Sequence, residues 1–566
     1  MNDLHFDETF DFVSVGSGGG SMASALLMRS LGKSVVVLEK MPRIGGTTSR
    51  SGGVMWIPNN RFMKEEGVED SYEKAMTYME ATAGQSLDAP GTTPAKRSAY
   101  VTEGPKMVDF LVANGIKMRR CPWWPDYYDD RPGGSVPGRT IVADLFNSNE
   151  LGEWRDRLEP NFLGNTPAYH YEGFEIGLAK TSWKGKAEMV KVGWRMIMAK
   201  LTGKRWVTAG GALQGRMMQA SLSAGVDLRI NSKVSSFIID DSGTVKGVVT
   251  ERNGKPWRVG ANLGVLVNAG GFSQNQEMRD KYQPGTSAKW TAATAGNTGE
   301  MILAMMNIGA AVGQMEEMVG NQMSIPPGKE GTGDGVSLGQ LAGGQMHYAK
   351  PHSIVVDQSG LRYMNEGGSY MAFCQNMLKR DKIVPAVPSW WIGDQHGRDK
   401  YHGGNPPKEW IESGFMKRAD TIEGLAALIG MDPAVLRKTI ETFNAGARKG
   451  VDEEFGRGNR AYDNWLGDFH RKDGSHTLGT IEKGPFYAAP VVPGDVGTYG
   501  GVVTDENARV LRDDGSWIEG LYATGISTAS VMGRIYPGAG SSVGPSFVFG
   551  YIAAKHAAHL GNQGVA

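Results

Sequence analysis

Residues 11–40 hold the pattern that most constrains what this chain can fold into. A short apolar run leads into the glycine-rich turn 16–21, a helical pattern follows, and a second apolar run ends at Glu39. A strand, turn, helix and strand in this order hold a pyrophosphate at the start of the helix and a ribose beside the acidic residue. Ser21 stands where the usual fingerprint has its third glycine, a small side chain that still permits close packing. The sequence therefore predicts a Rossmann-like dinucleotide site in an α/β fold.

The composition narrows the classes of protein to consider. A chain of 566 residues is too long for one ordinary core, so we expect at least two domains. The formal net charge of +0 argues against nucleic acid as a partner, because phosphate binding needs a basic surplus. The start lacks an apolar signal region, and the two cysteines, Cys121 and Cys374, have no metal-ligand spacing. We expect a reducing, cytoplasmic location and no metal site.

Three later segments indicate which dinucleotide binds. They read "GGTTSRSGG" at 45–53, "GVLVNAGGFSQN" at 264–275 and "GLYATGISTAS" at 520–530. This combination resembles the flavoprotein subunits of fumarate reductase and succinate dehydrogenase, which implies FAD as the cofactor. Covalent members carry the flavin on a histidine beside the Gly-Gly loop. Segment 45–53 has no histidine, so we expect noncovalent FAD.

The predicted FAD contacts come from these segments and from the start of the C-terminal helix, whose positive end would face the flavin. They are Gly16, Ser17, Gly18, Gly19, Gly20, Ser21, Glu39, Lys40, Gly45, Gly46, Thr47, Thr48, Ser51, Gly52, Gly53, Val234, Ala269, Gly270, Gly271, Asn297, Gly525, Ser541, Ser542 and Val543.

Three tyrosine contexts point to the substrate side of the flavin. They are "WWPDYYDDRPGG" at 123–134, "DQSGLRYMNEGG" at 357–368 and "RIYPGAG" at 534–540. Together they resemble the 3-ketosteroid Δ1-dehydrogenases, especially the branch that acts on cholest-4-en-3-one. The resemblance extends over nearly the whole chain, and the PDYY, RYxNE and YPGxG elements are its specific part. It implies 1,2-desaturation of a 3-keto-4-ene steroid in sterol degradation.

The resemblance also implies a role for each residue. Tyr363 matches the base that removes the C2 proton, and Tyr127, rather than Tyr128, matches the residue that assists it. Tyr536 and the Gly540 N–H match the two donors to the C3 carbonyl, and the C1 hydrogen leaves as hydride to flavin N5. The chemistry suits these types, because a proton beside a ketone leaves only if donors stabilise the enolate oxygen. A free phenol has a pKa near ~10, so the base needs a hydrogen-bonded neighbour at neutral pH.

Other interpretations stay open. Each tyrosine could be structural: Tyr127 or Tyr128 as packing at a domain seam, Tyr363 as the cap of a hairpin. A soluble fumarate reductase would share the FAD half, and His347, His352 and several arginines could bind its dicarboxylate. Dehydrogenation of the C4–C5 bond of 5α-steroids is the closer rival. A noncatalytic flavin-binding protein is the alternative from a different class.

A basic segment at 180–206 adds a possible membrane contact. It has eight Lys and Arg residues against one acid, Glu188, with tryptophan and methionine between them. Such a mixture suits an amphipathic element on an anionic membrane, from which a sterol would be drawn, so the protein could lie peripherally on the inner face. A solvated basic helix or a subunit contact is the alternative.

The motif order predicts a discontinuous architecture. We expect an FAD-binding domain from residues 1–316 and 497–566, with an expanded insert at about 143–206 and an α+β substrate domain at 317–496. The steroid would lie at the seam between the domains, above the flavin. An external electron acceptor, a quinone or another compound, would reoxidise the flavin.

Overall fold

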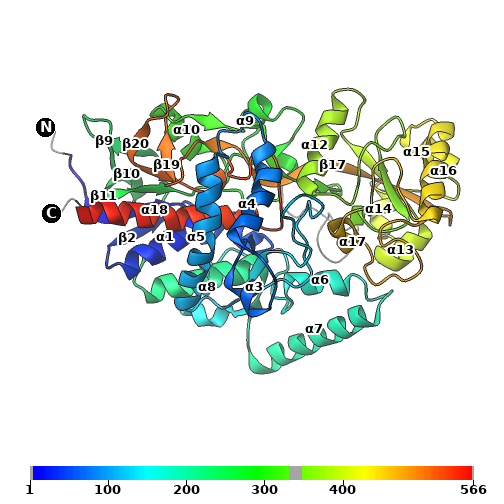
Figure 1. Cartoon of the computed structure of the whole chain (residues 1–566), viewed down its shortest axis with the longest axis horizontal. Helices are drawn as coiled ribbons and strands as arrows, with labels where there is room; N and C mark the ends of the chain where they lie inside the picture. Colours follow the sequence, from blue (N-terminus) through cyan, green and yellow to red (C-terminus); the bar gives the residue numbers. More distant parts are fainter. Residues whose placement is uncertain (1–3, 331–346, 564–566) are drawn as a thin grey trace.

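A large sheet forms the core of one half of the molecule. The computed structural model describes residues 4–330 and 347–563, and the sheet order is β19-β20-β11-β1-β2-β8, with β10 and β9 continuing from β11 (Figure 1). The strands β1, β2, β8, β11 and β20 run parallel, with Val13 paired to both Val36 and Val265. The strands are β1 (Glu8–Val15), β2 (Val35–Leu38), β8 (Asp227–Arg229), β9 (Ser236–Ile239), β10 (Val245–Arg252), β11 (Lys255–Val267), β19 (Arg509–Leu511) and β20 (Trp517–Ala523).

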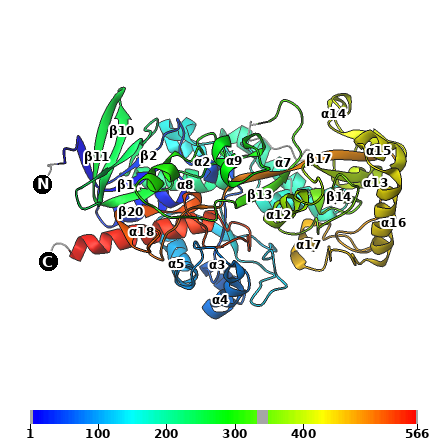
Figure 2. The same ribbon diagram turned by 90° about the horizontal axis from the view of Figure 1, so that it is seen from above.

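The predicted strand, glycine-rich turn, helix and strand form as expected. Helix α1 (Gly19–Ser30) follows β1 and packs against α18 (Val543–Gln563), so the two ends of the chain lie side by side (Figures 1 and 2). Glycine permits this close approach, because a Cβ on Gly20 would lie 2.4 Å from the carbonyl oxygen of Ser546. The contact brings the glycine-rich turn and the start of α18 to one place.

An antiparallel sheet forms the core of the other half, at the opposite end of the long axis (Figure 2). Its order is β13-β17-β15-β14, with β16 paired to β17. The strands are β13 (Met318–Met323), β14 (Ser353–Val356), β15 (Ser389–Asp394), β16 (Lys417–Ala419) and β17 (Phe486–Thr498). The mixed α/β fold expected from the sequence is confirmed, whereas the domain boundaries at 316 and 496 stay a prediction.

Helices cover both sheets. Those of the first half are α2 (Gly46–Arg50), α3 (Arg61–Glu65), α4 (Tyr72–Ala81), α5 (Pro94–Ala113), α6 (His170–Ile176), α7 (Trp183–Thr202), α8 (Ala209–Ser223), α9 (Gln276–Tyr282) and α10 (Glu300–Asn307). Those of the second half are α12 (Tyr370–Asp381), α13 (Gln395–Tyr401), α14 (Lys408–Glu412), α15 (Ile422–Ile429), α16 (Pro433–Lys449) and α17 (Ala461–Leu466). The segment 180–206 forms α7, which lies along one edge of the molecule (Figure 1).

Smaller sheets position the loops near the cavity. One has the order β3-β5-β4, from Val54–Trp56, Thr140–Ala143 and Met118–Arg120. Two-stranded pairs join β6 (Phe146–Asn147) to β7 (Trp206–Val207) and β12 (Val312–Gly313) to β18 (Gly501–Val502). The first of these sheets supports the tyrosine loops described below.

Candidate active site

One cavity of about 710 Å³ joins the glycine-rich turn to the tyrosine loops. Its size suits a large ligand together with part of a second one. The predicted FAD contacts that line it are Gly16, Ser17, Gly18, Glu39, Lys40, Gly46, Thr47, Thr48, Ser51, Gly52, Gly53, Val234, Ala269, Gly270, Asn297, Ser542 and Val543.

Seven predicted contacts are not in the cavity wall. They are Gly19, Gly20, Ser21, Gly45, Gly271, Gly525 and Ser541. At the start of α1, the Gly20 N–H donates to Ser546 Oγ at 3.1 Å and the Ser21 N–H donates to Asn268 Oδ1 at 3.2 Å. Gly20 and Ser21 thus hold α1 against its neighbours, behind the cavity wall. The motif could not separate wall positions from packing positions, because both require small side chains.

The end of the cavity beside β2 has the predicted acidic residue. Glu39 accepts hydrogen bonds from the Ser17 N–H at 3.0 Å, the Ser17 hydroxyl at 2.6 Å and the Met41 N–H at 2.9 Å. Burial raises the pKa of its carboxyl. Lys40 pairs with Glu300 and donates to the Thr298 hydroxyl at 2.9 Å. The carboxylate thus lies buried in the cavity wall and is bonded to the glycine-rich turn.

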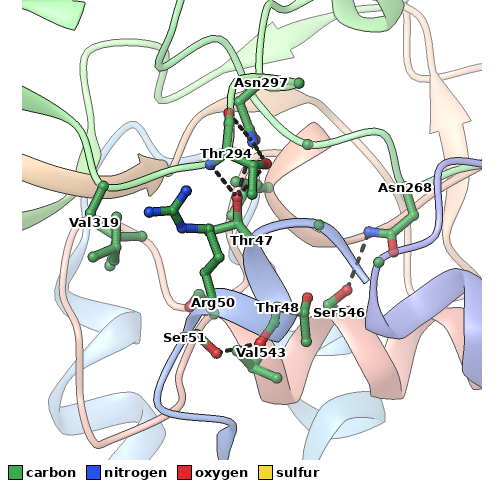
Figure 3. Close-up of a pocket in the computed structure, with 18 of the residues that line it drawn as sticks. Thr47, Thr48, Arg50, Ser51, Asn268, Thr294, Asn297, Val319, Val543 and Ser546 are labelled. Carbon is green, nitrogen blue, oxygen red and sulfur yellow. Dashed lines mark hydrogen bonds between the residues drawn. The ribbon is translucent and has the colours of Figure 1, made fainter. Parts of the chain in front are cut away.

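Hydroxyl and amide groups line the middle of the cavity (Figure 3). Thr47 Oγ1 accepts from the Thr294 N–H at 3.1 Å and from Asn297 Nδ2 at 3.0 Å. Arg50 extends from the same helix α2 toward Val319 (Figure 3). The sequence prediction did not include Thr294 or Arg50, although both lie close to predicted residues.

Three tyrosines meet at the far end, from loops distant in sequence. The ring centroid of Tyr370 lies 5.5 Å from that of Tyr127 and 5.0 Å from that of Tyr536, and Tyr127 and Tyr536 are 5.9 Å apart. All three line the cavity, together with Gly540. Tyr128 does not line it, so the choice of Tyr127 over Tyr128 agrees with the geometry.

Tyr363, the predicted base, is not part of this group. Its hydroxyl lies 2.7 Å from Ser389 Oγ, and its ring packs in the core of the second half, outside the cavity wall. Tyr370 lines the cavity but was not among the predicted residues. A signal was present in the sequence, since Tyr370 follows Gly-Gly-Ser directly before a helical pattern, and Tyr536 likewise lies in a glycine-containing loop before a helix.

Comparisons with known proteins agree with this geometry. The family model "FAD binding domain" matches residues 11–543. A 3-oxosteroid 1-dehydrogenase of Mycobacterium tuberculosis is 38% identical, over 97% of this chain and 98% of that protein. The chain belongs to the 3-oxosteroid 1-dehydrogenase family, and FAD is its cofactor.

Two further proteins are also similar to this chain. The solved structure of 3-ketosteroid Δ1-dehydrogenase from Sterolibacterium denitrificans, in complex with 1,4-androstadiene-3,17-dione, has a TM-score of 0.89 and 34% identity, over 98% of this chain and all of that one. A 4-oxocyclohex-2-ene-1-carboxylate 5-dehydrogenase of Sinomonas cyclohexanicum is 32% identical, over 97% of this chain and 94% of that protein.

Burial controls the ionisation of the tyrosines in this member of the family. It raises the pKa of Tyr127 and Tyr536 above the ordinary value, and that of Tyr370 far above it. All three are therefore neutral phenols near pH 7. The Tyr536 hydroxyl lies 3.0 Å from Ser542 Oγ, on the loop that also contains Gly540.

Position 540 requires glycine because of its backbone conformation and its close packing against β3. Its φ is +96°, and a Cβ there would lie 2.3 Å from the carbonyl oxygen of Val54. The loop therefore packs directly on β3. This contact holds the Gly540 N–H close to the Tyr536 side chain, at one end of the cavity.

Two negative findings apply to residues 4–330 and 347–563. Within these ranges no three His, Cys, Asp or Glu side chains gather as a metal site, and no helix is long and apolar enough to cross a bilayer. Cys121 and Cys374 are both buried free thiols.

Proposed function

We propose that the protein desaturates the C1–C2 bond of a 3-keto-4-ene steroid. The observation that carries the proposal is the meeting of Tyr127, Tyr370 and Tyr536 beside Gly540 at the end of an FAD-sized cavity. A neutral phenol can be buried in an apolar site and still donate or relay a proton. The names of the relatives, 3-oxosteroid 1-dehydrogenases at up to 38% identity, support the same substrate class.

The cavity wall fits noncovalent FAD. Glu39 would accept from the ribose, the turn at Gly16–Gly18 would adjoin the pyrophosphate, and α18 would direct its positive end at the flavin. FAD, when bound, accepts the C1 hydrogen with its electron pair. These contacts come from both ends of the chain, which supports a discontinuous FAD domain with the 317–496 substrate domain inserted in it.

The C3 carbonyl would accept hydrogen bonds from the Tyr536 hydroxyl and the Gly540 N–H. Both groups line the same end of the cavity. As the C2 proton leaves, negative charge develops on this oxygen, and donors already in place stabilise it without reorganisation. Such a pair lowers the barrier more than it tightens substrate binding.

Tyr370 is the proposed base, in place of Tyr363. In its ionised form, its phenolate oxygen would take the C2 proton and become the neutral phenol, and Tyr127, whose ring lies 5.5 Å away centroid to centroid, would assist it. Tyr127 stacks in turn on Tyr462 at 4.1 Å, so its ring has a defined orientation. The raised pKa makes the phenolate of Tyr370 a strong base, although only a small fraction is ionised at neutral pH.

A second substrate class is favoured by one observation. Arg50 lines the cavity, and a guanidinium binds a carboxylate well. The Sinomonas relative acts on 4-oxocyclohex-2-ene-1-carboxylate, which combines a ring ketone with a carboxylate. A 3-keto steroid or ring ketone with an acidic substituent is therefore the alternative substrate.

The test is anaerobic mixing of the yellow protein with cholest-4-en-3-one, androst-4-ene-3,17-dione or 4-oxocyclohex-2-ene-1-carboxylate. Flavin bleaching with a steroid product two hydrogens lighter, a 1,4-dien-3-one, supports the proposal. Bleaching by the carboxylate alone supports the alternative. Bleaching by none of the three overturns both.

We also propose that α7 binds an anionic membrane surface. Trp183, Val190, Trp194, Ile197 and Leu201 recur on one face of the helix, and each is more than half exposed. Exposed apolar residues in one stripe favour a lipid or protein contact over simple solvation. This sharpens the expectation from the sequence, which left a solvated helix open.

The charged residues near the exposed apolar face of α7 favour lipid as its binding partner. Lys186 and Lys204 lie over the rings of Trp183 and Trp206, at 4.3 and 5.5 Å, so each pairs a cation with an aromatic ring as an interfacial segment does. Lys191 and Arg195 instead form ion pairs with Glu172 of α6, which attach the helix to the body.

Cosedimentation with liposomes containing anionic lipid tests this proposal. The wild type should bind, and a variant lacking 180–206 should not. Equal binding by the two proteins overturns the proposal, and so does equal binding to neutral and anionic vesicles.

A further inference from the structure

The carbonyl of Pro537 joins two of the tyrosine loops. It accepts a hydrogen bond from the Tyr127 N–H at 2.9 Å and a second one from the Tyr78 hydroxyl at 2.7 Å. Pro537 directly follows Tyr536 in the chain. The Pro537 carbonyl oxygen therefore links the backbone of Tyr127 to the residue that follows Tyr536.

The Tyr78 hydroxyl makes a second bond that completes the connection. It accepts from the Tyr128 N–H at 3.3 Å, so it bridges the loop 126–128 to the loop 536–540. Tyr78 belongs to α4 and is fully buried, and it does not line the cavity. Its effect on the reaction would be indirect, through the two loops.

The surroundings of Tyr78 hold it in one orientation. Its ring lies 5.8 Å from that of Trp56 and 5.3 Å from the guanidinium of Arg139. Arg139 pairs with Asp70 at 2.8 Å and with Asp126, the residue before Tyr127. Asp126 accepts from Trp56 Nε1 at 2.8 Å. These buried contacts leave the hydroxyl little freedom to choose other partners.

The neutral form of the Tyr78 phenol suits a hydrogen-bond donor. Burial, followed by the nearby Asp126 carboxylate, raises the pKa of Tyr78 far above its ordinary value. The phenol is therefore neutral near pH 7 and donates to the Pro537 carbonyl. Unlike Tyr370, it does not line the cavity, so it has no access to the substrate.

We infer that Tyr78 is a positioning residue for the proposed reaction: it fixes Tyr127 relative to Tyr536 by bridging the Tyr128 N–H and the Pro537 carbonyl. The inference rests on the proposed function. Proton transfer depends on donor and acceptor distances, and a misplacement of about 1 Å can cost about a hundredfold in rate. Removal of the hydroxyl leaves the Tyr128 N–H buried without this acceptor and removes one of the two hydrogen bonds to the Pro537 carbonyl.

The test is Tyr78→Phe, which removes one oxygen atom and keeps the ring against Trp56. We expect kcat per bound flavin to fall about tenfold or more, with little change in KM or in flavin content. The isotope effect on kcat should increase for substrate deuterated at C2, where Tyr127 assists, and stay near the wild-type value for substrate deuterated at C1. A general loss of packing would not move the two isotope effects differently.

Two controls make the result specific. Tyr348→Phe removes another buried hydroxyl, which lies 3.1 Å from Ser324 Oγ, away from the tyrosine loops, and it should keep the wild-type kcat. Tyr78 replaced by 4-aminophenylalanine retains a donor at the same place and should recover most of kcat, even if the phenylalanine variant folds poorly. An amino variant as slow as Tyr78→Phe overturns the inference.

Different experimental results would contradict the positioning role of Tyr78 and the proposed function. If the wild type turns over no 3-keto-4-ene steroid, the proposed function is wrong. If the wild type is active and Tyr78→Phe has the same kcat per flavin and the same C2 isotope effect, only the positioning role is wrong.

Discussion

The rings of Tyr370 and Tyr536 lie 5.0 Å apart, centroid to centroid, although one begins α12 and the other belongs to the loop before α18. Two phenols from separate parts of the chain thus face one end of the FAD cavity. This arrangement allows one group to take a proton while the other stabilises the oxygen left behind.

Replacement of Tyr370 by Phe should remove the hydroxyl that acts as the proposed base. We expect kcat to fall by about 10²–10⁴, the range typical of a lost general base, with FAD still bound. The measurement is the rate of anaerobic flavin reduction by androst-4-ene-3,17-dione. Tyr363→Phe is the matched control, because its hydroxyl contacts Ser389 outside the cavity, and it should retain turnover. The opposite result, a slow Tyr363 variant and an active Tyr370 variant, would restore the original assignment.

Tyr536→Phe should lower kcat more than it raises KM. The lost donor acts on charge that develops only as the C2 proton leaves, and one such donor is worth about 10²–10³ in kcat. Steady-state kinetics with cholest-4-en-3-one measure the change. A rise in KM at unchanged kcat would mean that the hydroxyl binds substrate without stabilising the transition state.

The pH profile should rise toward alkaline pH. The proposed base acts as phenolate, and burial raises the pKa of Tyr370 far above 10.0, so its ionised fraction grows with every step up in pH below that value. We expect log(kcat/KM) to increase across the range from pH 7 to 10. A plateau that begins near neutrality would point to a base with a lower pKa than a buried phenol.

Glu39→Ala should weaken FAD binding without altering the fold. The change removes the acceptor for the Ser17 hydroxyl and N–H at the ribose end of the cavity. Flavin content after gel filtration should fall, and added FAD should restore activity. Glu39→Gln keeps an acceptor of similar shape, so it should lose less flavin. Full flavin retention by Glu39→Ala would contradict the ribose assignment.

The membrane proposal can be tested with single residues. Trp194→Glu places a charge in the exposed apolar stripe of α7 and should reduce cosedimentation with anionic liposomes. Lys191→Gln is a suitable control, because Lys191 already pairs with Glu172 of α6. Steroid turnover in detergent-free buffer should be unchanged in both. Equal liposome binding by Trp194→Glu and the wild type would contradict lipid contact through this face.

The local patterns of the sequence were sufficient for much of the site. The turn 16–21 and Glu39 could be predicted because strand, glycine turn, helix and acidic residue lie within one short unit. The place of Tyr127 and Tyr536 in the cavity wall could be predicted because their motifs are specific. Which small residues of the fingerprint face the cavity could not be predicted, since Gly18 at the wall and Gly20 at the helix crossing obey the same size limit.

The sequence by itself thus determined the cofactor, the fold class and two of the tyrosines that line the cavity, and only the tertiary structure showed the third. Tyr363 and Tyr370 lie in one short segment, and both follow turn-forming residues. Their difference arises from packing: the core of the second half takes the ring of Tyr363 beside Ser389, whereas the start of α12 directs Tyr370 toward Tyr127 and Tyr536. Those contacts join segments far apart in the chain, and a local pattern has no information about which distant surfaces will meet.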